Sequence, residues 1–227
     1  MNLAMSAKAV PLFEAVKTFI KNEIDPITAE YFRLGDGRSN RWQYGEGQLE
    51  LLNSVKAKAK KAGLWNFFLP NAETGEGLSN LDYAYIANEL GKNPIASECF
   101  NCSAPDTGNM EVLERVGTPE QKKRWLEPLL AGEIRSAYAM TEPDVASSDA
   151  KNLECRAVKD GDEWLINGEK FYISGAGDPR CKILICMLRT SQDGPPHGRH
   201  SQILVPMDTP GVEILGHMEV FGEDDAP

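Results

Sequence analysis

The spacing of apolar residues changes near residue 133, and this change constrains the fold more than any other feature of the 227-residue chain. Before it, apolar residues recur every three or four positions, which is typical of amphipathic helices. The clearest such stripe consists of Phe13, Val16, Ile20, Ile24 and Ile27. After it, short apolar runs are separated by turn-forming dipeptides, which is typical of strands. The sequence therefore predicts an α+β fold, with an N-terminal helical bundle at residues 1–133 and a small antiparallel β-domain at residues 134–227.

Local signals place the helix ends in the first half. Pro11 suits the first turn of a helix, where its missing amide has no partner, and Pro26 is expected to end or kink that helix. A second helix is expected to start near Gln48 and to end at Gly63. The remaining expectations are a loop at residues 33–47, extended chain across the core at residues 64–70, a helix after residues 105–106, and helices capped by Ser79 and Thr118.

Turn signals divide the second half into strands. Asp160-Gly161 predicts a two-residue hairpin, and Asn167-Gly168 predicts a second turn. Residues 182–188 form a continuous apolar run, which predicts a strand buried on both faces. The expected strands are residues 153–158, 164–166, 171–174, 182–188, 202–205 and 212–215.

Composition and charge exclude several classes of protein. No apolar run approaches the roughly 20 residues that a membrane span needs, and the N-terminus has no signal-peptide h-region, so we expect a cytoplasmic protein without a membrane span. The net charge of −10 argues against nucleic acid as a partner, because binding phosphates needs clustered Lys and Arg.

The residues that could bind a metal do not form a complete set. Cys99 and Cys102 have C-x-x-C spacing, but no second pair completes a zinc site. His197 and His200 lack further ligands nearby in the sequence. We therefore expect no metal, and we expect the five cysteines to be buried or incidental reduced thiols.

Two stretches form a candidate binding site. Residues 137–149, Ala-Tyr-Ala-Met-Thr-Glu-Pro-Asp-Val-Ala-Ser-Ser-Asp, predict a strand that runs into a small, hydroxyl-rich loop. Residues 170–175, Lys-Phe-Tyr-Ile-Ser-Gly, predict a strand with Tyr172 and Ser174 on one face. A flat heteroaromatic cofactor could stack on the ring and bond to the hydroxyl. The alternative is ordinary strand residues beside a polar turn.

Two further patterns in this region have simpler interpretations. Gly175-Ala-Gly177 begins like a dinucleotide fingerprint, but the third glycine is missing and Pro179 interrupts the helix that should follow. Glu142 and Asp144 could be an acid–base pair, but we interpret them as loop carboxylates that bond backbone amides.

Taken together, the two stretches resemble the flavin-binding region of acyl-CoA dehydrogenases. That family carries a T-E-P loop that ends in S-D, as in residues 141–149, and an N-G-x-K-x-(W)-I-(T/S) segment, as in residues 167–174. Residues 117–126 and 132–133 are similar to the family's segment just upstream. Residues 144–149, 174–177 and 203–211 most resemble the branch that contains human family members ten and eleven. The likeness covers nearly the whole chain.

The resemblance implies that FAD and acyl-CoA lie between a helical N-terminal domain, a β-domain and a second helical domain. The Thr141 amide and hydroxyl would meet the pyrimidine end of the flavin, where reduction builds negative charge. Tyr172 would stack beside the ring and Ser174 would bond near N5, while Ser148 would also meet the thioester arm of the substrate. The implied cofactor-binding residues are Tyr138, Met140, Thr141, Ser147, Ser148, Tyr172, Ile173 and Ser174.

Two departures from the family pattern bear on these contacts. Tyr172 stands where many relatives have Trp, and the loop at residues 141–149 is one residue longer than the shorter form in the family. Both fit the branch named above.

The resemblance also implies a reaction, the α,β-dehydrogenation of an acyl-CoA thioester. A carboxylate removes the α-proton while the β-hydrogen leaves as hydride to flavin N5. An acceptor of the electron-transfer flavoprotein type and a homo-oligomer are expected. The chain ends at Pro227, before the family's second helical domain, which supplies the catalytic glutamate. We therefore assign no catalytic residue, and we expect a truncated chain that holds FAD weakly and cannot turn over alone.

Two alternatives stay open from the sequence. The same scaffold serves acyl-CoA oxidases and flavin-dependent oxygenases, which differ in the electron acceptor. The chain could also be a binding or scaffolding derivative without catalysis.

Overall fold

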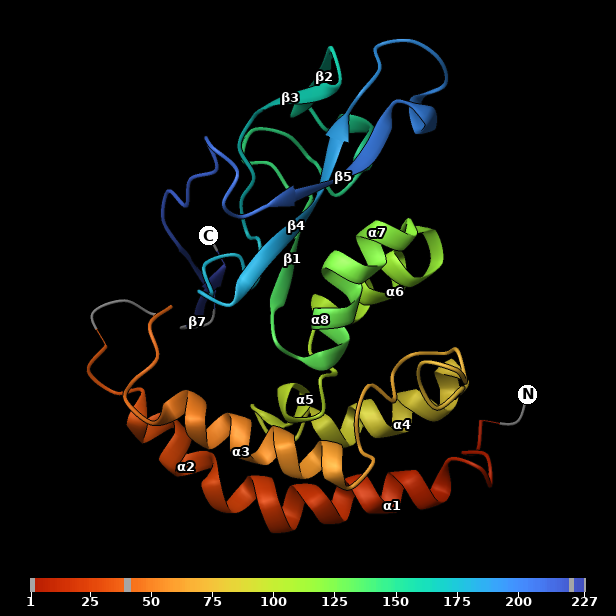
Figure 1. The fold of residues 1–227 in the computed structure, drawn as a ribbon, viewed down its shortest axis with the longest axis vertical. Helices are drawn as coiled ribbons and strands as arrows, with labels where there is room; N and C mark the ends of the chain where they lie inside the picture. The colour runs from red at the N-terminus through yellow and green to blue at the C-terminus, as the bar shows by residue number, and fades with distance from the viewer. Residues whose placement is uncertain (1–2, 39–41, 221–222, 227) are drawn as a thin grey trace. The chain divides into compact units, whose positions relative to one another are not determined.

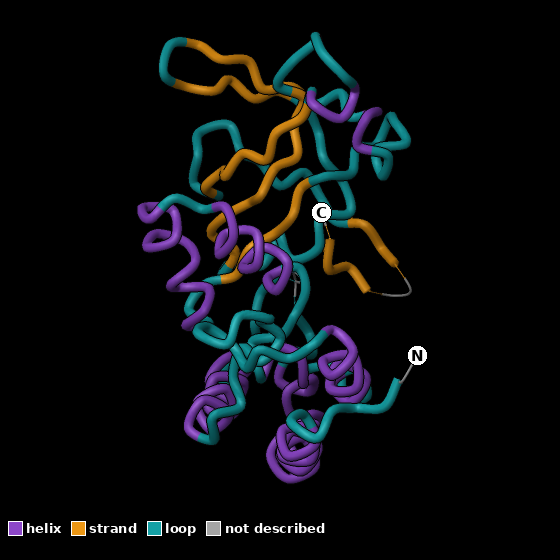
Figure 2. Tube along the Cα trace, turned by 90° about the vertical axis from the view of Figure 1, so that its right-hand side faces the viewer, coloured by secondary structure: helices purple, strands orange, loops and turns teal. Residues whose placement is uncertain are grey.

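The structure is a computed structural model that describes residues 3–38, 42–220 and 223–226. By internal contacts it consists of two compact units, Met1–Glu111 and Val112–Pro227, and each is described by itself. Figure 1 traces the chain in colour, and Figure 2 shows the helices in purple and the strands in orange. The two units are separated within helix α6. The domain boundary that the sequence predicts, between residues 133 and 134, stays a prediction.

The first unit is helical, as the sequence predicts. Its elements are α1 (Val10–Phe19), η1 (Ile20–Ile24), α2 (Asp25–Leu34), α3 (Gln48–Lys61), α4 (Asn80–Leu90), α5 (Ala96–Cys99) and the first part of α6 (Asp106–Val116). Helix α3 packs on α2 and α5, and α4 packs on α1 and α5 (Figure 1). Three phenylalanine rings meet in the core, with centroids 5.3 Å apart for Phe19 and Phe100 and 5.5 Å apart for Phe67 and Phe100.

Two prolines lie inside longer helical stretches, each just after a single π-helical turn. Pro26 follows η1 and Pro128 follows η2, and the amides of Asp25 and Glu127 bond five residues back within these turns. A proline inside an α-helix removes a hydrogen bond and clashes with the carbonyl four residues earlier, and a widened turn relieves that clash. Of the two expected outcomes for Pro26, an end or a kink of the helix, the end is therefore wrong. The chain stays helical to Leu34, so the loop begins later than residue 33.

Other helix signals are confirmed, with one correction. Gln48 begins α3, and Gly63 follows it with a φ of 72°, the left-handed conformation that glycine adopts easily. The Ser79 hydroxyl caps α4 by accepting from the Asp82 amide. The expectation of extended chain at residues 64–70 is wrong: Phe67 and Phe68 are buried there, but the backbone forms turns.

The second unit contains a five-stranded sheet. Its helices are the end of α6, then α7 (Pro119–Gln121), η2 (Lys122–Leu126), α8 (Glu127–Ala131) and the 3-10 turns η3 (Ala150–Asn152) and η4 (Pro196–Gly198). Its strands are β1 (Arg135–Ala139), β2 (Arg156–Asp160), β3 (Glu163–Asn167), β4 (Cys181–Arg189) and β5 (His200–Pro206), with β6 (Met218–Val220) and β7 (Glu223–Ala226) as a separate antiparallel pair.

The helical-then-β fold class is confirmed, but the sheet is mixed rather than antiparallel. The order is β1-β4-β2-β3, and β5 also pairs with β4. Strand β4 runs parallel to β1 and to β2, and antiparallel to β5. Parallel neighbours need a long connection, which here separates β1 from β4, and short-range turn signals do not report such pairings.

Strand β4 is the centre of this sheet. Ile183, Ile185 and Leu188 are buried, as the continuous apolar run predicts. The β2–β3 hairpin is also confirmed, although its two loop residues are Gly161 and Asp162, one position later than the dipeptide signal. The strand expected at residues 212–215 is absent. The Val212 amide bonds to the Thr209 carbonyl and closes a turn, and after this turn the backbone pairs with no strand among the described residues.

Candidate flavin site

The predicted site residues lie on two segments of the second unit, the loop after β1 and the segment after β3. The strand expected at residues 171–174 is wrong: these residues are irregular, and Tyr172 has a φ of 57°. The exposures still alternate as a strand would have them. Tyr172 and Ser174 are exposed and Ile173 between them is buried, so the ring and the hydroxyl are accessible together.

A buried ion pair joins the two segments. The Lys170 ammonium lies 2.7 Å from Glu142 Oε1, and it also donates to the Met140 carbonyl at 2.9 Å and to the Met187 carbonyl of β4 at 2.8 Å. The two side chains are only 11% and 5% exposed, so the pair is shielded from water. The three acceptors use all three donors of the ammonium. Lys170 therefore ties the loop after β1 to the segment after β3 and to the central strand.

Glu142 is a loop carboxylate, as we interpreted it. Its carboxylate accepts from the backbone amides of Glu154 at 2.8 Å and Cys155 at 3.1 Å. Burial alone would raise the pKa of Glu142, but the bonds from Lys170 and from these amides outweigh burial, so the pKa lies below its ordinary value. Glu142 is thus a fixed anion. Asp144 is exposed.

Thr141 is held by the opposite segment. Its carbonyl accepts from the Phe171 amide at 3.0 Å, and its hydroxyl donates to the Phe171 carbonyl. Among the hydrogen bonds of the described residues, none uses the Thr141 amide. These contacts place Thr141 beside Phe171, whose ring centroid lies 4.7 Å from that of Tyr172. They leave the Thr141 amide available as a donor.

The remaining predicted residues differ in accessibility. Ser148 is exposed, whereas Ser147 is 3% exposed and its hydroxyl accepts from the Glu142 amide at 2.6 Å. Tyr138 is half-buried on β1, and its hydroxyl accepts from Gln202 at 3.1 Å. Met140 contributes the carbonyl that Lys170 binds. The cofactor-binding roles of these four residues stay predictions. Ser147 has a structural role as well, because its bond to the Glu142 amide joins two positions of the same loop.

The sequence missed the role of Lys170. Its three acceptors lie 17 to 30 residues away in the chain, so no local spacing reports them. The available signal was a lysine placed between a turn and an apolar segment, and a glutamate between Thr141 and Pro143. Neither position was expected to be buried, because Lys170 follows a turn and Glu142 lies in a loop expected to be polar.

The cysteines are free and buried, as predicted. Burial raises the pKa of Cys99, Cys102 and Cys155 to about 12, so these thiols stay protonated. Within residues 3–38, 42–220 and 223–226, no group of three or more His, Cys, Asp or Glu side chains could hold a metal ion. In the same ranges no helix has the length and apolar character that crossing a bilayer requires.

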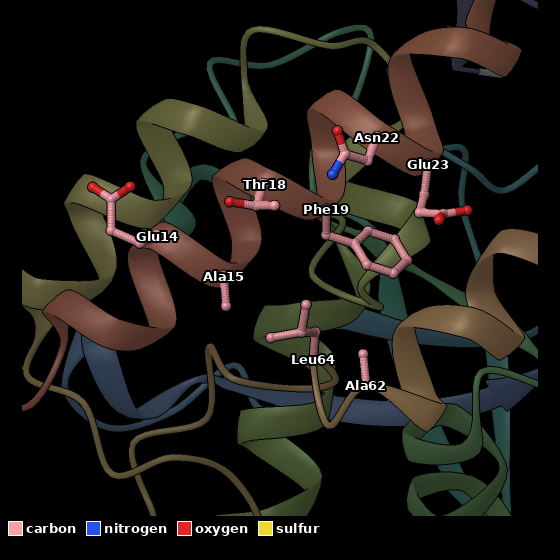
Figure 3. A pocket seen from close by; sticks show the side chains of 8 residues that line it. All are labelled: Glu14, Ala15, Thr18, Phe19, Asn22, Glu23, Ala62 and Leu64. Carbon is pink, nitrogen blue, oxygen red and sulfur yellow. The ribbon is translucent and has the colours of Figure 1, made fainter.

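The first unit has an open hollow of about 470 Å³ on its surface. Figure 3 shows its lining, with α1 and η1 on one side and the segment after α3 on the other. Phe19 and Leu64 form apolar lining, and Glu14 and Glu23 contribute carboxylates. None of the predicted site residues lines it.

Two models of known protein families match this chain. The family model described as "Acyl-CoA dehydrogenase, N-terminal domain" matches residues 8–133, and "Acyl-CoA dehydrogenase, middle domain" matches residues 137–227. The chain therefore belongs to the acyl-CoA dehydrogenase family.

Individual relatives confirm the expected branch. The chain is 48% identical to "Acyl-CoA dehydrogenase family member 11" of Mus musculus over 96% of its length, and 46% identical to mouse family member 10 over 95%. It is 47% identical to "Probable acyl-CoA dehydrogenase FadE2" of Mycobacterium tuberculosis over 99%. It spans 28% of mouse member 11, 20% of mouse member 10 and 54% of FadE2.

Solved structures share the fold. A structure assigned to the acyl-CoA dehydrogenases, from Mycobacterium abscessus, is 48% identical, with a TM-score of 0.87 over 96% of this chain and 55% of that one. The glutaryl-CoA dehydrogenase of Mycobacterium smegmatis in complex with FADH2 is 23% identical, with a TM-score of 0.62 over 91% of this chain and 47% of that one. The second likeness concerns the fold alone.

Proposed function

We propose that this chain binds FAD through the loop after β1 and the segment after β3, as part of an acyl-CoA dehydrogenase. One observation carries the proposal: the Thr141 carbonyl and hydroxyl are bonded to Phe171, the Thr141 amide is unused among the described residues, and Tyr172, the neighbour of Phe171 in the chain, is exposed. A loop that is fixed on one side and offers a donor on the other is preorganised to bind a polar ring edge.

The chemistry of the accessible groups fits a flavin. Tyr172 offers a ring that is 43% exposed, which is a surface for stacking. Ser148 and Ser174 are exposed hydroxyls, and the Thr141 amide is a further donor. A flavin needs one apolar face and several donors at its edge, and this set supplies both.

Within the dehydrogenase, the proposed task of this chain is binding and orientation. FAD supplies the hydride acceptor, N5, when it is bound. Thr141 would donate to the pyrimidine end, Tyr172 would flank the ring, Ser174 would bond near N5, and Ser148 would meet the thioester arm of the acyl-CoA substrate. An acceptor of the electron-transfer flavoprotein type and a homo-oligomer complete the proposal. We assign no catalytic base among the described residues.

A titration of the 227-residue chain with FAD, in which the quenching of flavin fluorescence measures binding, tests this proposal. We expect saturable binding that weakens by about three- to tenfold in Tyr172→Ala, because the stacking surface is lost. Trp164→Ala is the matched control, since Trp164 is 44% exposed in the same unit and belongs to no predicted site. Equal weakening by both substitutions, or no saturable binding by the wild-type chain, would contradict the proposal.

A further inference from the structure

Lys170 contacts the peptide that carries the unused donor of the site. The Met140 carbonyl that accepts from Lys170 at 2.9 Å belongs to the same peptide unit as the Thr141 amide. That peptide is trans, and a trans peptide is planar, so its C=O and N–H point in opposite directions. When the ammonium fixes the carbonyl, it also fixes the direction of the amide.

We infer that Lys170 is a positioning residue that orients and polarises the Thr141 amide for the flavin ring. The inference rests on the function proposed above and adds a residue and a physical cause to it. A cation bound to a peptide oxygen draws electron density from the peptide, which makes its N–H a stronger hydrogen-bond donor. A stronger donor at the pyrimidine end stabilises the negative charge that builds there on reduction.

The surroundings of Lys170 make this effect strong and rigid. Its side chain is 11% exposed, so water screens the ammonium little. The bonds to Glu142 and to the Met187 carbonyl hold the ammonium from two other directions. All three donors are used, and the flat fork of an arginine could not reproduce three bonds that diverge from one nitrogen.

A purely structural role is the competing explanation, because Lys170 also neutralises the buried Glu142. Removing the lysine alone would leave an unpaired buried carboxylate, which is strongly destabilising. The comparison is therefore made in a Glu142→Gln background, where the single side-chain oxygen can accept from the amide of Glu154 or of Cys155 but not from both, because these amides bond different carboxylate oxygens. Both variants that are compared share this loss. The E142Q reference keeps the Lys170 ammonium on the Met140 and Met187 carbonyls without its carboxylate partner. Lys170→Met in that background removes the ammonium, so E142Q/K170M has neither member of the ion pair.

The deciding measurement is the ¹H shift of the Thr141 amide in the ligand-free chain, recorded for E142Q and for E142Q/K170M. We expect the Thr141 resonance to move upfield in the double variant, because the polarisation is lost, while the Ser174 amide does not move. With FAD, we expect about tenfold weaker binding to the double variant and a more negative reduction potential of the bound flavin. A structural role alone would lower stability without moving the potential.

The matched control is Lys182→Met in the same background. Lys182 also donates to a backbone carbonyl, that of Pro179 at 2.7 Å, but it is exposed on β4. We expect this substitution to change neither the Thr141 resonance nor FAD affinity. An unmoved Thr141 resonance in E142Q/K170M, or FAD affinity and potential equal to those of E142Q, would overturn the inference. If the wild-type chain binds no FAD, the proposed function fails, and the Thr141 resonance alone decides the role of Lys170.

Discussion

Tyr172 combines an aromatic side chain with a backbone conformation that such residues avoid. Its φ of 57° lies in the left-handed region, which costs a residue with a Cβ about 1–2 kcal/mol. The ring is 43% exposed, so the free energy gained by burying it offsets only part of this cost. Strained residues of this kind persist where the surrounding structure holds them and where the side chain has a function.

The strain at Tyr172 predicts a reversal of the usual order of stability. Tyr172→Gly and Tyr172→Ala both remove the ring, but only glycine removes the strain, so we expect the glycine variant to be more stable by about 1 kcal/mol. At Ser174, which has no positive φ, alanine should be the more stable of the same two substitutions. Urea unfolding measures both pairs. The same order at both positions would show that Tyr172 is unstrained.

The sequence indicated which two segments form the candidate site, but not how they are held. Tyr172 and Ser174 were identified from their types and spacing, and Ser148 from the family resemblance; all three are exposed in the structure. The bonds of Thr141 to Phe171 and of Lys170 to Met140 connect residues 30 positions apart, so they depend on the fold.

Among the elements, the helix starts were the most predictable. The capping box at Thr118 needs residues only three positions apart, and both of its bonds are present: the Thr118 hydroxyl accepts from the Gln121 amide, and the Gln121 side chain accepts from the Thr118 amide. Such signals are local. The parallel pairing of β1 with β4 was missed, because it joins residues far apart in the chain, such as Ser136 with Ile183.

The Thr118 cap gives a prediction at this scale. Thr118→Ala leaves the Gln121 amide without its acceptor, and we expect a loss of about 1 kcal/mol in the free energy of unfolding. Thr118→Ser keeps the hydroxyl and should lose little. Far-ultraviolet circular dichroism during urea unfolding compares them. Equal losses in both variants would show that the cap is not the source of the effect.

At the scale of the whole molecule, two buried or half-buried groups make stability depend on pH in the same direction. The pKa of Glu142 lies below its ordinary value of 4.5 because its bonds outweigh burial. The pKa of His200 lies below 6.5, because burial and the nearby Arg189 and Arg199 disfavour its charged form. In both cases the unfolded chain takes up the proton first as pH falls, so acid favours unfolding.

This linkage predicts a stepwise loss of stability on acidification. The contribution of His200 is fully present above about pH 6.5 and falls below it, whereas that of Glu142 is present above about pH 4.5 and is lost as pH falls through its lowered pKa. Free energies of unfolding from urea titrations between pH 7.5 and pH 3 should therefore differ between wild type and Glu142→Gln by about 2 kcal/mol near neutrality and converge in acid. Glu154→Gln, at an exposed carboxylate, is the control. A difference that persists unchanged to pH 3 would contradict the assigned role of Glu142.

The central claim is that a flavin ring meets the Thr141 amide, and a solved structure of this chain with FAD bound tests it most directly. We predict the nitrogen of that amide within about 3 Å of a polar atom at the pyrimidine end of the ring, with the Tyr172 ring at its flank. An ordered flavin elsewhere on the chain, with no ring atom bonded to that amide, would contradict the claim.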